Sequence, residues 1–229
     1  MATVIGYLDS VLPPMSLFLM IGYHAYLWQC FKHRQSQTTL GIDALMRNSW
    51  FSHLDITQAN DKKGMLAVQS LRNTLMATIL TATVAILING ALAALTNNSY
   101  TQDHLFKSPL FGSRSGTIYV LKFGSASICV LLSFLCSSMA VRYLIDASFL
   151  INALGEFSSV ADAQLVLERG FMLATVGNRM LCVAFPMVIW LFGPIPMAMS
   201  TVALVWGLHE LDFAPKLAIC DVKKLDCEL

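Results

Sequence analysis

Charged residues are scarce in this sequence. Asp, Glu, Lys and Arg make up 13% of its 229 residues, about half the share found in a typical soluble domain. The net charge is +1 and no block of like charges occurs. Nucleic-acid binding needs a basic stripe that displaces counterions from phosphates, so this class of partner is excluded.

Motifs for metal binding and catalysis are also missing. None of the six cysteines forms a Cys-x-x-Cys pair and the five histidines are scattered, which argues against zinc. The sequence has no Gly-x-Ser-x-Gly elbow and no glycine-rich phosphate loop. We therefore predict no metal, no cofactor and no catalytic residues, and an enzyme is not the favoured class.

Long apolar stretches are what the sequence does contain. Apolar residues make up 56% of the chain, and about 20 of them in a helix suffice to cross the hydrocarbon core of a bilayer. The sequence predicts an all-α polytopic membrane protein with one domain over residues 1–215 and a polar tail over 216–229. The four predicted transmembrane helices are Val11–Phe31, Leu75–Leu95, Ile118–Val141 and Leu181–Leu208.

The fourth stretch contains Pro186, Pro194 and Pro196. Two membrane spans and a turn need about 34 apolar residues or more, so one kinked helix is predicted, with a re-entrant hairpin as the alternative. The break at Gly193-Pro194-Ile195-Pro196 is either a packed kink or one of two features found in transporters, a hinge or a cation-coordinating site. The polar residues that follow could bind a cation, but solvated cap residues are the simpler expectation; they are His209, Glu210 and Asp212.

A further helix is predicted at the membrane interface over residues 41–54. Its apolar residues recur every three or four positions, which is typical of an amphipathic helix on the inner leaflet. A gating contact with the spans is the alternative role. The apolar face holds Ile42, Leu45, Met46, Trp50 and Leu54, and the polar face holds Asp43, Arg47, Asn48 and Ser52.

The positive charges predict the orientation. None precedes the first stretch, whereas Lys32 and Arg34 follow it, so the N-terminus is predicted to be extracytosolic. The loops Lys32–Arg72 and Arg142–Arg179 then lie in the cytosol, and the tail lies outside. The host is the plasma membrane or an endomembrane.

Small residues predict how the helices pack. Ala82 and Ala85 belong to a small-residue face of the second span, and Ser125 and Ser133 to one of the third. Such faces drive helix association in lipid, where the hydrophobic effect does not. They serve either the bundle itself or an interface in a homo-oligomer or with a partner membrane protein.

Two sets of polar residues are candidate functional sites. The first, for an anion or a lipid headgroup, is expected at cytosolic helix ends, where basic residues also serve as simple anchors. The second marks a pathway or gate, in which a buried histidine either relays protons or only packs. The first set is Arg72, Asn73, Arg142 and Arg179, and the second is His24, Asn89, Pro186, Gly193, Pro194 and Pro196.

Three segments carry a family resemblance: Val68-Gln69-Ser70-Leu71-Arg72-Asn73-Thr74-Leu75-Met76, Lys122-Phe123, and Trp190-Leu191-Phe192-Gly193-Pro194-Ile195-Pro196. The chain resembles the plant branch of the family catalogued as domain of unknown function 599, from about Gly6 to Ala214. The resemblance implies a multi-pass membrane protein and no activity at any named residue.

The favoured function is that of a channel or transporter for a small solute or ion, with an anion as the preferred class. The alternative is a membrane scaffold or regulatory subunit that transports nothing and binds a partner protein through its small-residue faces. Membrane lipids are partners in either case.

Overall fold

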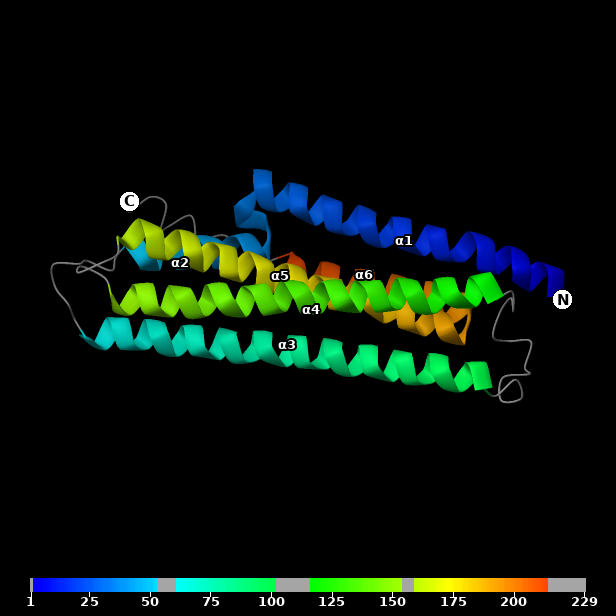
Figure 1. Ribbon diagram of the computed structural model, residues 1–229. Coiled ribbons are helices and arrows are strands. Elements are labelled where there is room, and N and C mark those ends of the chain that lie inside the picture. The colour runs from blue at the N-terminus through cyan, green and yellow to red at the C-terminus, as the bar shows by residue number, and fades with distance from the viewer. Residues whose placement is uncertain (1, 53–60, 102–115, 154–158, 214–229) are drawn as a thin grey trace.

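The computed structural model describes residues 2–52, 61–101, 116–153 and 159–213, which form a bundle of helices (Figure 1). Two short 3-10 turns, η1 (Gln35–Gln37) and η3 (Trp190–Phe192), connect neighbouring helices. The α-helices are α1 (Ala2–His33), α2 (Thr39–Ser52), α3 (Asp61–Thr101), α4 (Gly116–Asn152), α5 (Val160–Ile189) and α6 (Pro194–Asp212).

Three helical segments within the described residues are long and apolar enough to cross a membrane: Val68–Asn97, Val120–Asn152 and Val160–Phe192. They indicate an integral membrane protein. The predicted span 75–95 falls within the first segment, and most of 118–141 falls within the second. The predicted span 11–31 lies inside α1, which is not among the three, so the four-span scheme is not established.

The predicted single kinked helix over 181–208 is wrong. The helix α5 ends at Ile189, and α6 begins at Pro194 and runs back along the bundle (Figure 1). Gly193 between them has φ 136° and ψ 167°, a backbone conformation open essentially to glycine alone. Pro194 then starts α6, where its missing N–H leaves no hydrogen bond unmade.

The predicted cytosolic loop over 142–179 is also wrong. The helix α4 continues to Asn152, and α5 begins at Val160. Ser159 caps α5, because its hydroxyl accepts a hydrogen bond of 3.2 Å from the backbone N–H of Asp162. Arg142 and Arg179 therefore lie inside helices and not at their ends.

Three helices, α3, α4 and α5, form what we call the core, with α4 packed on both of the others. One contact cluster joins Ala85, Val130 and Ala184, and another joins Leu71, Leu144 and Leu167. Of the predicted packing residues, Ala85 and Ser133 are fully buried inside the chain, whereas Ala82 and Ser125 are half-buried.

The remaining long helices, α1 and α6, form a pair that we call the wing. The helix α1 packs chiefly on α6, and α6 contacts α5. The wing thus lies on one side of the core (Figure 1).

The end of α6 lies beside α2. Phe213 forms an isolated β-bridge with Thr38, the residue that precedes α2. The chain therefore leaves α6 at the α2 end of the bundle and not at the end where α1 begins (Figure 1). This overturns the expectation that the tail starts on the N-terminal side, although residues 216–229 themselves lie outside the described residues.

The helix α2 covers Thr39–Ser52, two residues earlier than the predicted 41–54. Ile42 is buried, as the apolar pattern predicts, but Met46 is exposed. Arg47, predicted on the polar face, lies 4.2 Å from the centroid of the Phe171 ring on α5. The helix therefore packs on α5 through a residue of the predicted polar face. The side chain of Trp50 and the whole of Leu54 lie outside the described part.

Candidate functional site

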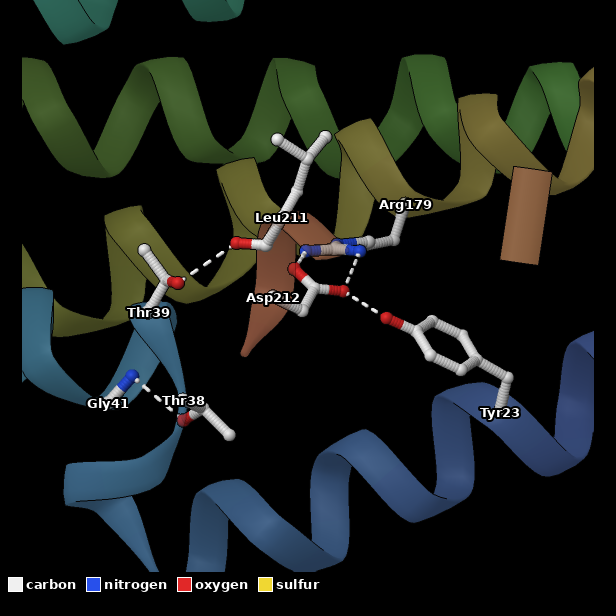
Figure 2. Close-up of polar contacts among 7 residues, drawn as sticks. All are labelled: Tyr23, Thr38, Thr39, Gly41, Arg179, Leu211 and Asp212. Atoms are coloured by element: carbon white, nitrogen blue, oxygen red, sulfur yellow. Dashed lines mark hydrogen bonds and ion pairs between the residues drawn. The ribbon is translucent and has the colours of Figure 1, made fainter. Parts of the chain in front are cut away.

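An ion pair links the wing to the core. The two terminal guanidinium nitrogens of Arg179 on α5, Nη1 and Nη2, donate hydrogen bonds to the carboxylate of Asp212, at the end of α6. The bond from Nη1 to Oδ2 is 2.6 Å long. The hydroxyl of Tyr23 on α1 donates to the same Oδ2 at 2.5 Å. Three helices thus converge on one carboxylate (Figure 2).

Arg179 belongs to a helical segment that is long and apolar enough to cross a membrane. Any window of about 20 residues, the length that spans hydrocarbon, includes Arg179 if it is placed within Val160–Phe192. The side chains of Arg179 and Asp212 are only 16% and 4% exposed. Charged residues within membrane-spanning segments are rare and usually paired, and by default they mark functional sites.

The start of α2 helps to hold Asp212 in place. Thr39 Oγ1 donates a hydrogen bond of 2.9 Å to the carbonyl oxygen of Leu211. Thr38 is fully buried, and its hydroxyl accepts from the backbone N–H of Gly41 at 3.2 Å, which caps α2 (Figure 2). The carboxylate therefore sits at a junction of α2 and α6 as well as in the Arg179 fork.

The four residues of the predicted anion site do not converge. Arg72, Asn73 and Arg142 are exposed on α3 and α4. On the antiparallel helices α4 and α5, Leu144 lies against Gly170, and Ser137 lies against Gly177. By this register, Arg142 on α4 is level with a residue of α5 near position 172. Arg179 is then roughly 10 Å further along α5, at 1.5 Å per residue. The exposed arginines form a separate layer closer to the α2 end.

The predicted pathway residues are also dispersed. His24 follows Tyr23 on α1, and the two rings make an edge-to-face contact. Its Nδ1 lies 2.8 Å from the Met20 carbonyl oxygen, and its buried Nε2 has no hydrogen-bond partner among the described residues. Asn89 accepts a 2.6 Å hydrogen bond from Ser127, which joins α3 to α4.

The prolines of this set surround the α5–α6 turn. Pro186, Gly193 and Pro194 are buried, whereas Pro196 is exposed. Pro186 continues α5 without ending it, and the turn itself forms at Gly193. The turn lies at the opposite end of the bundle from α2 (Figure 1).

A second buried cation, Lys122, lies near this turn. The residue is 4% exposed, and its Nζ lies 5.5 Å from the centroid of the Trp190 ring, within range of a cation–π interaction. Both residues belong to segments that carried the family resemblance, but their hydropathy gave no sign that they meet. The contact ties the start of α4 to the turn.

A third cation, Arg47, secures α2 on the core. Its guanidinium stacks on Phe171, and burial lowers its pKa, while the carboxylates of Asp43 and Glu168 act in the opposite direction. An arginine stays charged through such a shift. The contact therefore holds a cation at the α2 end of the bundle.

Sequence reasoning missed the two partners of Arg179. Asp212 was expected to be a solvated cap residue, but it is buried. Tyr23 was not singled out at all. The available signal was Arg179 in an apolar stretch and two acids, Glu210 and Asp212, after it, with a glycine and prolines between them that permit a reversal of the chain.

Comparison with known proteins places the chain in a family without assigning an activity. No curated protein and no solved structure matches the chain. The family model described as "Protein of unknown function, DUF599" matches residues 11–217. This match covers most of the sequence, so the chain belongs to the DUF599 family.

Proposed function

We propose that this protein transports a small solute or ion across a membrane, with an anion as the preferred class. The observation that carries the proposal is the buried Arg179–Asp212 ion pair between core and wing. Ionisable residues inside membrane helices commonly mark substrate or ion pathways. A pair used only for packing is a poor choice, because apolar residues of similar volume stabilise a fold as well or better.

The wing is the proposed moving part. It contacts the core through α5, through the ion pair and through the junction with α2. Transporters often expose a central site alternately by rocking one helix group against another around broken helices. Here the Gly193 turn is the hinge, and the Arg179–Asp212 ion pair between core and wing holds the closed arrangement.

The proposed orientation places the α2 end in the cytosol. Lys32, Arg34, Arg72 and Arg142 belong to this end of the bundle, as the positive-inside rule requires. If α1 and α6 both cross, five crossings put the N-terminus outside and the C-terminal tail inside. The exposed arginine layer then faces the headgroups of anionic lipids on the inner leaflet. The host is the plasma membrane or an endomembrane.

The scaffold alternative is less well supported. The surface expected to bind a partner protein included Ala85 and Ser133, and both are fully buried between helices of the same chain. Homo-oligomerisation remains part of the proposal and would use the lipid-facing side. The exposed apolar residues available for it include Phe18 on α1 and Leu135 on α4.

Flux measured in proteoliposomes tests the proposal. Wild-type protein is compared with Arg179→Met and with Arg72→Ala, at matched insertion and with a range of anions and cations. Transport through the buried site predicts loss of flux in Arg179→Met and retention in Arg72→Ala. No flux in correctly inserted wild-type protein would reject transport. Loss in Arg72→Ala alone would move the site to the exposed arginine layer.

A further inference from the structure

We propose that Arg179 and Tyr23 form a binding site for a free carboxylate, and that Asp212 is the tethered occupant of this site. The transported anion is then a small monocarboxylate that competes with Asp212. The statement that this anion is transported rests on the proposed function. The binding site itself does not depend on transport.

The donors match a carboxylate in number and in arrangement. Arg179 supplies two N–H groups, one to each oxygen of Asp212, and Tyr23 supplies an O–H to Oδ2. A planar guanidinium fork recognises a planar two-oxygen anion better than a spherical one. A chloride ion would occupy only one point of this arrangement. The geometry therefore favours carboxylate over halide.

The guanidinium donors and the occupant belong to different parts of the molecule, whereas Tyr23 lies on the wing together with Asp212. Arg179 is fixed on the core, within the tightly packed α4–α5 pair. Asp212 is the last residue of α6, on the wing. Movement of this helix end would withdraw the carboxylate from the fork while the guanidinium stays in place. An isolated guanidinium at this depth is unfavourable, so a free anion that replaces Asp212 stabilises the open arrangement.

The size of the site follows from the side chain that fills it. Asp212 fits into the fork with a single carboxylate on one methylene group, and it is 4% exposed. Replacing Asp212 with Ala removes the volume of a carboxylate and leaves the three donors unsatisfied. Formate has this volume and charge, so it is the probe of choice.

Chemical rescue of Asp212→Ala tests the site in the purified full chain. Thermal unfolding in detergent is followed in sodium formate and in sodium chloride at equal ionic strength. The variant is expected to unfold at a lower temperature than wild type in chloride. Formate is expected to restore at least half of the loss with a saturable dependence on concentration. Arg179→Met/Asp212→Ala, which lacks the fork, should show no difference between the two salts.

The same comparison includes results that would overturn the inference. Equal unfolding temperatures of folded Asp212→Ala in formate and chloride would show that the fork does not accept a free carboxylate. If Asp212→Ala does not fold in chloride, recovery only when formate is present throughout purification supports the site. Asp212→Ser serves as the second variant. If formate raises the unfolding temperature of neither variant, the binding site is rejected.

Flux separates this inference from the proposed function. Formate rescue without any wild-type transport would leave the binding site standing and reject the transporter. Wild-type transport without formate rescue would support the transporter and reject the carboxylate site.

Discussion

Ser133 on α4 donates a 2.6 Å hydrogen bond from its hydroxyl to the backbone carbonyl oxygen of Gly177 on α5. The helices approach so closely because Gly177 has no side chain. A Cβ at this position would lie 2.4 Å from Ser137 Oγ and 3.1 Å from the Ser137 backbone nitrogen. Lipid provides no hydrophobic drive for helix association, so small residues at such a crossing supply the attraction through close packing.

Gly177→Ala is expected to destabilise the protein by about 1–3 kcal/mol, because the added methyl group overpacks the crossing. The matched control is Gly124→Ala on α4, where a Cβ would meet no heavy atom within 4 Å. Alanine is favoured over glycine within a helix by about 1 kcal/mol, so the control should be neutral or stabilising. Thermal unfolding in detergent, followed by circular dichroism, measures both. Equal stability of the two variants would contradict the close crossing.

Removing one member of the buried ion pair is expected to cost far more than removing both. Asp212→Leu leaves the Arg179 charge uncompensated, and a loss of about 3–5 kcal/mol is typical of such a change. The double variant Arg179→Met/Asp212→Leu should recover most of this loss. A double-mutant cycle in detergent gives the coupling energy. Additive losses from the two single variants would show that the pair is not formed.

Gly193→Ala is expected to destabilise the α5–α6 turn by about 1–3 kcal/mol, because φ 136° is strained for any residue with a Cβ. The control is Gly207→Ala within α6, where a Cβ would have no neighbour within 4 Å. Thermal unfolding and limited proteolysis of the purified protein report on the turn. An unaffected Gly193→Ala protein would argue for a continuous helix through this region.

The direction of α6 predicts the side of the membrane on which the chain ends. A C-terminal epitope tag should share its side with a single cysteine introduced at exposed Asp43 on α2, in a background that lacks native cysteines. An N-terminal tag should lie on the opposite side. Protease protection and labelling with a membrane-impermeant maleimide in sealed vesicles locate all three. A C-terminal tag on the N-terminal side would restore the four-span scheme.

Two helices of the core were predictable because hydropathy reports directly on lipid contact. The stretch Leu75–Leu95 contains no charged residue, and Ile118–Val141 contains only Lys122. Both stretches proved shorter than the helices α3 and α4, because backbone hydrogen bonding continues beyond the apolar part. Sequence patterns therefore located these helices but not their ends.

The first half of α5 was missed for the opposite reason. Asp162, Glu168 and Arg169 are exposed along it, and they interrupt the apolar run that would have indicated a span. The turn at Gly193 was misjudged because hydropathy carries no information about φ. Arg179 and Asp212 come together only because the chain reverses at that turn. The sequence pattern therefore could not predict the candidate site.

The order of the two charges along the chain has a consequence for biosynthesis. Asp212 follows Arg179 by 33 residues. The ribosome therefore adds Arg179 to the chain well before it adds the counterion. A nascent chain in which α5 has been inserted before α6 holds an unpaired arginine near the middle of α5. Insertion of such a residue costs roughly 2.5–3.5 kcal/mol on translocon scales. Arrival of the last helix removes this penalty. The helix α6 thus supplies the counterion of α5, and a nascent chain without α6 holds Arg179 without that partner.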